Sequence, residues 1–298
     1  HTRCSGVSWG SEMCIRDRYK NSRFTATGSL LGTYITDKVE QGEKPDDKRR
    51  LSPAVSLSWR PFSESTLRIR ASYKDIFRVP TFTDLYYLRM GNTNLKPEET
   101  SQYNVGVTWS SSCGDWLRHF SISADGYYNT VKDKIVALPT MYVWKMMNMG
   151  EVDIKGVDVN LSTQFRLPLR MSLLLASTYS FQYAVDVTDP EAKNYKDQIP
   201  YTPRHSGTVS VTLENPWVNV SYILTAVGDR YALPQNIDRN RIDSYIEQSI
   251  SINRDFRFRY FGLRLQGELL NLANVNYDVI QYYPMPGRSW RLSICLSY

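Results

Sequence analysis

The sequence lacks any long hydrophobic run. No stretch of its 298 residues approaches the roughly 18 consecutive apolar residues that a membrane helix needs, and the mean hydropathy is −0.42. A helical membrane protein is therefore excluded. A membrane β-barrel is not excluded, because its strands alternate lipid-facing apolar residues with polar ones, and its average hydropathy resembles that of a soluble protein.

Histidine and cysteine are scarce, which argues against hydrolytic, metal or redox chemistry. None of the three histidines has a nucleophile or carboxylate arranged beside it. His205 and Ser206 are neighbours in an alternating segment, which directs their side chains to opposite faces. The four cysteines, Cys4, Cys14, Cys113 and Cys295, lack the CxxC spacing of a zinc or redox site. We therefore expect no enzyme activity, no metal site and no cofactor.

Clustered charge is also missing. The net charge of +6 comes from 36 basic and 30 acidic residues that are mixed through the chain, so nucleic-acid binding is not indicated. The first residues show no charged start followed by an apolar run, so the signal peptide that a secreted barrel requires is expected upstream.

Residues 1–19 do not follow a strand pattern, and Ser11-Glu-Met-Cys-Ile-Arg-Asp-Arg18 resembles translated sequencing adapter. We interpret residues 1–19 as a non-native segment. Residues 20–298 are expected to form one β-barrel portion.

What the sequence does contain is alternation, most clearly at the C-terminus. One face of the last segment carries Trp290, Leu292, Ile294, Leu296 and Tyr298. The intervening positions are polar or small, and a strand places the two sets on opposite faces of a sheet. An apolar face that ends in an aromatic residue is typical of a transmembrane barrel strand.

About twelve such segments follow residue 20, joined by connections that are alternately short and long. This pattern predicts an all-β, transmembrane antiparallel β-barrel. The predicted strands are 23–34, 52–60, 66–75, 101–110, 118–131, 151–165, 169–184, 203–213, 217–228, 244–254, 259–271 and 288–298. The long loops are 35–51, 76–100, 132–150, 185–202, 229–243 and 272–287. Since the last strand ends on the periplasmic side, all six loops are expected outside the cell.

The charged face of these strands cannot contact lipid, because an Arg or Lys there would cost about 2–4 kcal/mol at the membrane midplane. We expect this charged face to line the lumen of the barrel. Its residues are Arg68, Arg70, Lys74, Arg264, Gln266, Glu268 and Arg291. The arginines either attract an anionic ligand or, as we favour, pair with acids such as Glu268 or with an internal plug. A soluble β-sandwich also alternates, but it explains the connections and the aromatic strand ends less well.

Three stretches carry motifs of one known family. The first is Phe77-Arg-Val-Pro-Thr-Phe-Thr-Asp-Leu-Tyr-Tyr87 with Gly91-Asn-Thr-Asn-Leu-Lys-Pro-Glu-Glu99, and the second is Asn148-Met-Gly-Glu-Val-Asp-Ile-Lys-Gly-Val-Asp158. The third joins Asn271-Leu-Ala-Asn-Val-Asn-Tyr277 to the aromatic-terminated last strand. Together they resemble TonB-dependent outer-membrane receptors. In that family the first is similar to an extracellular loop and the second to the start of a long strand. Trp290, Leu292, Ile294, Leu296 and Tyr298 resemble its barrel-assembly signal.

The resemblance implies the C-terminal part of a barrel of about twenty-two strands in a Gram-negative outer membrane. It implies a multi-pass receptor that imports a large, scarce ligand such as cobalamin or a ferric siderophore. Oligosaccharides are a lower-ranked class of ligand. The implied partners are the TonB–ExbB–ExbD energy-coupling system, the barrel assembly machinery, the lipid and lipopolysaccharide membrane, and a small-molecule or metal-chelate ligand. The plug and the TonB-pairing segment of the family are not in this sequence. The alternatives are a passive porin or structural barrel and an adhesin-like soluble β-protein.

Candidate ligand contacts lie in the long loops, where selectivity is expected. Residues 139–149 place four methionines with aromatics in one connection, which suits a broad apolar ligand. The same composition fits, slightly better, a hydrophobic pad that holds loops together or contacts a surface partner. The candidates are Tyr86, Tyr87, Arg89, Tyr142, Trp144, Met146, Tyr282 and Tyr283.

Overall fold

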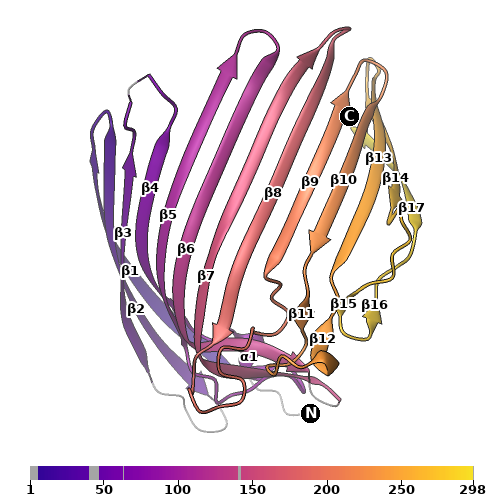
Figure 1. Ribbon diagram of the computed structural model, residues 1–298. Coiled ribbons are helices and arrows are strands. Elements are labelled where there is room, and N and C mark those ends of the chain that lie inside the picture. Colours follow the sequence, from indigo (N-terminus) through magenta and orange to yellow (C-terminus); the bar gives the residue numbers. More distant parts are fainter. Residues whose placement is uncertain (1–5, 40–46, 63, 140–141, 298) are drawn as a thin grey trace. The chain divides into compact units, whose positions relative to one another are not determined.

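The computed structural model describes residues 6–39, 47–62, 64–139 and 142–297, and most of them lie in β-strands (Figure 1). Within these residues, no helix combines the length and the apolar composition needed to cross a membrane. One antiparallel sheet contains 13 strands. They are β1 (Gly6–Lys20), β2 (Phe24–Val39), β3 (Lys48–Trp59), β4 (Arg68–Arg78), β5 (Glu98–Cys113), β6 (Leu117–Pro139), β7 (Trp144–Leu167), β8 (Met171–Asp186), β9 (His205–Glu214), β10 (Asn219–Val227), β13 (Tyr245–Arg257), β14 (Gly262–Leu270) and β17 (Ser289–Ser297).

The remaining elements are short and lie in the long connections. They are α1 (Phe82–Tyr86), β11 (Arg230–Tyr231), the 3-10 turn η1 (Asp238–Asn240), β12 (Arg241–Ile242), β15 (Asp278–Ile280) and β16 (Tyr283–Pro284). β11 pairs with β12 and β15 pairs with β16, so two of the long connections contain small hairpins.

The strands of the large sheet pair in the order in which they occur in the sequence, as an unbroken meander (Figure 1). Antiparallel neighbours need only a tight turn between them, which explains the short connections on one side. The contacts group the chain into two units, one with residues 1–106, 126–155 and 184–197, the other with residues 107–125, 156–183 and 198–298. β5, β6, β7 and β8 continue from one unit into the other.

All twelve predicted strands are present, which confirms the all-β prediction. A thirteenth strand, β1, was not predicted, because residues 1–19 showed no strand pattern. It nevertheless pairs with β2 from Gly6 to Lys20. Backbone pairing along an existing edge does not require side-chain alternation, since every residue except proline carries the same donor and acceptor.

The loop predicted at 132–150 was wrong. β6 continues to Pro139 and β7 begins at Trp144, so most of that segment is strand. Polar strand ends pair as well as apolar ones once their neighbours are in place, because pairing uses the backbone groups. Asp133, at a φ of 51°, is a local irregularity within β6.

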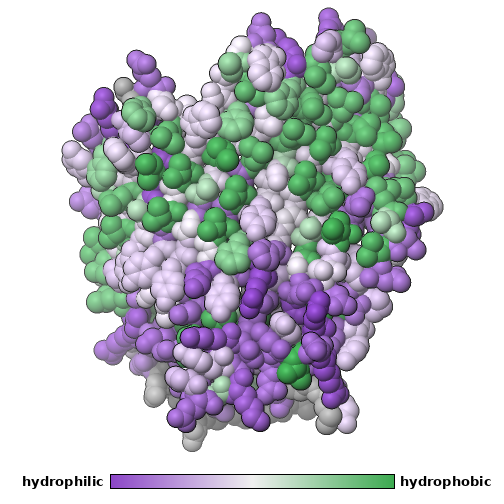
Figure 2. Space-filling model, viewed as in Figure 1, coloured by the Kyte–Doolittle hydropathy of each residue, from purple (hydrophilic) through white to green (hydrophobic). Residues whose placement is uncertain are grey.

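The two faces of the sheet differ in polarity, as the alternation predicted. In β17, Trp290 and Leu292 are 80% and 65% exposed and share a face with Ile294 and Leu296. Tyr298 lies outside the described residues. Figure 2 shows hydrophobic side chains over the middle and upper parts of the strands in view and hydrophilic ones at their lower ends. An exposed apolar face of this extent requires an apolar environment.

The opposite face carries paired charges. Arg291 forms an ion pair with its cross-strand partner Glu268, as the sequence suggested. Arg264 makes two hydrogen bonds to Asp255, at 2.6 and 3.0 Å, and Gln266 donates to Glu268 at 2.9 Å. Opposite charges across a strand pair stabilise the sheet modestly and leave this face polar.

This polarity difference gives a direct test on one strand. In phospholipid vesicles, Leu292→Lys should lower the free energy of unfolding by about 2–4 kcal/mol, because it places a charge on the apolar face. Ser293→Lys, one residue along on the polar face, should change it by only about 0.5 kcal/mol. Urea titration followed by the gel mobility of unheated samples measures both. Equal losses for the two variants would contradict the assignment of the faces.

Candidate ligand-binding loops

The loop between β4 and β5 is built around the short helix α1. Thr81 caps this helix, since its hydroxyl accepts from the Asp84 N–H at 3.2 Å and the Asp84 carboxylate accepts from the Thr81 N–H at 2.9 Å. Arg78 forms an ion pair with the buried Asp84 at 3.3 Å. After the helix the chain turns back at Gly91, where a Cβ atom would lie 2.6 Å from the Leu85 carbonyl oxygen. Any side chain at Gly91 would therefore displace the turn.

The same loop is fastened to the beginning of β7. The Met146 N–H donates to the Met90 carbonyl at 2.9 Å, and the Asn92 amide donates to the Met146 carbonyl at 3.1 Å. Asn148 accepts from the Lys96 N–H at 2.8 Å and donates to the Lys96 carbonyl at 3.1 Å. Its amide also donates to the Asp133 carbonyl of β6 at 2.7 Å. Asn148 therefore holds three segments together.

The structure places the predicted contacts of this unit in different environments. Tyr86 packs against Phe82 in a tilted arrangement, with ring centroids 4.8 Å apart, whereas Tyr87 and Arg89 are exposed. Tyr142 is 90% exposed. Trp144 and Met146 lie on β7 rather than in a loop.

Of the four methionines of 139–149, Met141 lies outside the described residues, and Met146, Met147 and Met149 do not form one surface. Residues 144–149 are strand, so alternation places Met146 on the opposite face from Met147 and Met149. Of the latter two, Met147 is exposed and Met149 is buried. The expected cluster in a single connection was wrong for this reason. The loop and the strand instead meet through the backbones of Met90 and Met146.

The second unit has its own loop cluster, centred on Arg230. This side chain is only 3% exposed. Its guanidinium donates to the carbonyl oxygens of Asp278 and Val279 and lies 5.4 Å from the ring centre of Tyr245, which stacks on Tyr277 at 4.1 Å. Arg230 thus ties the β11–β12 hairpin to the loop after β14.

A pocket of about 310 Å³ lies beside this cluster. Arg241 at its wall is held by Asp229 at 2.9 Å and by Asp243 at 3.4 Å, so the charge of Arg241 is compensated. Tyr282, predicted as a ligand contact, lines the pocket and is 79% exposed. The other lining residues are Ile242, Ser244, Asn276, Tyr277, Asp278, Gln281 and Pro284. Tyr283 is exposed on β16 and does not line it.

The sequence offered no signal for Arg230 or Arg241. Both lie in the predicted loop 229–243, but isolated arginines in a polar loop have no distinguishing pattern. Only folding shows that Arg230 is buried.

Burial and nearby charge shift the pKa of two tyrosines in this cluster. Burial raises the pKa of Tyr277, and the charges of Glu247 and Tyr245 add to the effect. Burial also raises the pKa of Tyr201, although its hydrogen bond to the Gln281 backbone and the Arg230 charge lower it. Both phenols therefore favour their neutral form in the folded loops.

This chemistry is suited to binding rather than to catalysis. Among the described residues, no three His, Cys, Asp or Glu side chains gather as a metal site. His205 contacts the Tyr179 hydroxyl at 2.9 Å. An antiparallel sheet with one apolar and one polar face is typical of the membrane β-barrel class.

Comparison with known proteins places the chain within this class. The family described as "TonB dependent receptor-like, beta-barrel" matches residues 15–272, and the chain belongs to that family. It is a family of outer-membrane transport receptors and not of enzymes.

Curated relatives include vitamin B12 transporters from two bacteria. The one from Photobacterium profundum is 27% identical over 76% of this chain and 34% of the relative. The one from Vibrio vulnificus is 24% identical over 72% of this chain and 32% of the relative. The chain thus spans about a third of their length.

Solved structures show the same fold at lower identity. The ferric citrate transporter FecA has a TM-score of 0.75 at 12% identity, over 98% of this chain and 45% of that one. The copper transporter OprC has a TM-score of 0.74 at 15% identity, over 98% and 48%.

The role of Asn148 can be tested by removing its side-chain amide. Asn148→Ala leaves the Lys96 N–H and two carbonyl groups without these partners, so the free energy of unfolding should fall by about 1–3 kcal/mol. Protease cleavage between β4 and β5 should become faster. Asn94→Ala, in the same loop but exposed, is the matched control, and an unchanged cleavage rate in Asn148→Ala would refute the fastening role.

The Tyr277 shift predicts a pH dependence of stability. The folded pKa lies above the unfolded value near 10.0, so the unfolded state loses its proton first. Stability is therefore unaffected at neutral pH and falls as the pH rises through about 10. Urea titrations from about pH 9 to about pH 11 should show a smaller loss in Tyr277→Phe. The loss should be unchanged in Tyr283→Phe, which removes an exposed hydroxyl.

Proposed function

We propose that this chain is the C-terminal barrel portion of a Gram-negative outer-membrane receptor that imports cobalamin or a ferric siderophore with energy delivered through TonB. The observation that carries the proposal is the ordered state of the polar loops. Asn148 and Arg230 each hold their loops through several hydrogen bonds. Ordered loops reduce the entropy lost on binding a ligand, which suits capture at low concentration.

The relatives support active transport rather than passive diffusion. Two are named as vitamin B12 transporters, and the fold is shared with a ferric citrate transporter. We propose that the same TonB–ExbB–ExbD system acts on a plug that precedes this chain. We further propose that the barrel assembly machinery recognises the last strand through Trp290, Leu292, Ile294, Leu296 and Tyr298.

The proposed ligand contacts fall into two groups. In the first unit they are Tyr86, Tyr87, Arg89, Tyr142, Trp144 and Met146, and in the second they are Tyr282 and Tyr283. Tyr282 is the strongest of them, because it is exposed beside a pocket that offers both hydrogen-bonding groups and an aromatic wall.

Uptake by the complete receptor tests the proposal. Expressed in a strain without its own receptor, it should import labelled cobalamin or a ferric siderophore, and deletion of TonB should abolish import. Residues 20–298 alone should import neither. Uptake that persists without TonB would instead identify a passive porin.

The ligand contact is tested by measuring the affinity of the complete receptor for the ligand that it imports. Tyr282→Ala should weaken ligand binding about tenfold, which corresponds to about 1.4 kcal/mol. Tyr260→Ala, which removes an exposed tyrosine far from the pocket in the β13–β14 turn, should leave binding unchanged. Equal affinities for Tyr282→Ala and the unmodified receptor would exclude this pocket as a binding site.

A further inference from the structure

A groove of about 560 Å³ lies in the apolar face of the sheet, over β3, β4, β5 and β6 of the first unit. Leu57 pairs with Ala71, and Val55 pairs with Tyr73 one step further along the same face. Ala71 and Gly126 have little or no side chain, so the surface is recessed beside them. The groove thus arises because small residues on β4 and β6 lie next to larger ones on the adjoining strands.

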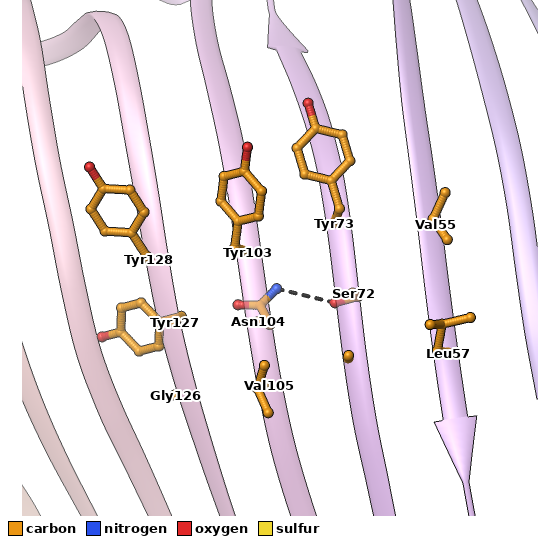
Figure 3. Close-up of a pocket in the computed structure, with 11 residues that line it drawn as sticks. Val55, Leu57, Ser72, Tyr73, Tyr103, Asn104, Val105, Gly126, Tyr127 and Tyr128 are labelled. Atoms are coloured by element: carbon orange, nitrogen blue, oxygen red, sulfur yellow. Dashed lines mark hydrogen bonds between the residues drawn. The ribbon is translucent and has the colours of Figure 1, made fainter.

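Three tyrosines, Tyr73, Tyr103 and Tyr128, lie side by side on neighbouring strands at one end of the groove (Figure 3). The rings of Tyr73 and Tyr103 are 5.0 Å apart and those of Tyr103 and Tyr128 are 6.5 Å apart. Their hydroxyls point the same way, toward the end of β4 that leads into the α1 loop (Figure 3). The Tyr128 hydroxyl also donates to Asp153 of β7 at 3.2 Å.

The groove is therefore apolar along its length and polar at one end. Val55, Leu57 and Val105 supply its apolar sides, and all three are exposed. Ser72 and Asn104 point to the other face of the sheet, where Asn104 donates to Ser72 at 3.4 Å. The polar atoms of the groove are thus concentrated at the tyrosine hydroxyls, which is the arrangement that an amphiphile requires.

We propose that this groove binds one acyl chain of a lipid in the membrane leaflet on the long-loop side, with the lipid headgroup at the tyrosine hydroxyls. The proposal rests on the outer-membrane location of the proposed function. In lipid, an apolar surface gains nothing merely by being covered, because the surrounding tails are equally apolar. A recess differs from a flat surface, since a chain lying in it gains dispersion contacts on several sides and an empty recess loses them.

The position of the tyrosines fits this orientation. Tyrosine prefers the membrane interface, with its ring among the tails and its hydroxyl among polar headgroups. Beyond the tyrosines, β6 and β7 carry the ion pair of Lys132 and Glu151, at 3.5 Å, so the apolar band ends there. An acyl chain that lies between Val55 and Val105 then has its lipid headgroup at the level where polar side chains begin.

Native mass spectrometry of the purified complete receptor tests the proposal. The receptor is released from micelles that contain either lipid A or dipalmitoylphosphatidylglycerol, and the retained lipids are counted. The unmodified receptor should retain lipid A, and Ala71→Trp, which fills the groove, should reduce this retention several-fold. If Ala71→Trp does not fold, Ala71→Leu is used instead. It fills the groove partly and should reduce lipid A retention by a smaller factor.

The control is Ala226→Trp, on the same face as the exposed Ile246 with which Ala226 pairs. It should retain as much lipid A as the unmodified receptor. Equal retention by Ala71→Trp and the control would overturn the proposal, as would retention of phosphatidylglycerol alone. A loss of dimers in Ala71→Trp without loss of lipid would also overturn it, because the groove would then be a contact between copies. Lipid retention does not depend on TonB, so a failure of uptake leaves this result unaffected.

Discussion

The pairing of each strand with the next one along the chain is the interaction on which the rest of the structure depends. In an apolar environment an unpaired backbone N–H or C=O costs several kcal/mol, so the ladder must continue wherever the apolar face continues. The ladder also continues beyond the apolar residues of β6 and β7, and β1 follows β2 from end to end, because the backbone groups pair whatever the side chains are. Side-chain polarity decides which face a residue occupies, but the backbone decides how far the strand runs.

A sheet of this kind leaves most side chains exposed on one face or the other, and burial is concentrated where the long connections fold over the strand ends. Val152 is completely buried near the first loop cluster, and Arg230 is almost completely buried in the second. The loops are therefore held by hydrogen bonds and local packing rather than by a large common core. The strands thus satisfy the backbone hydrogen bonds that an apolar environment requires, while the loops are ordered by contacts of their own.

Much of the fold could be predicted because it depends on local patterns. The alternation of Leu292 and Ser293 identifies a strand and its two faces without any knowledge of the neighbours, and the ion pair of Arg291 with Glu268 followed from the same reasoning. The methionine-rich segment was misjudged because strand extension depends on partners. Lys132, inside the segment expected to be a loop, forms an ion pair with Glu151 of the neighbouring strand β7. The loops at 76–100 and 272–287 were located correctly as connections, but their architecture was not predicted, since Asn148 bonds across 52 residues of sequence to Lys96.

The sequence by itself determined the all-β class, the two-faced character of the strands and the membership of a transport-receptor family, because period-two alternation and short motifs are local properties. Only the tertiary structure decided that Arg230 is buried beneath the loop after β14, that Asn148 joins three segments, and that Ala71 and Gly126 line one groove with three tyrosines. Each of these depends on strand register and on how distant segments meet. A single residue's place in the sequence carries no information about such contacts.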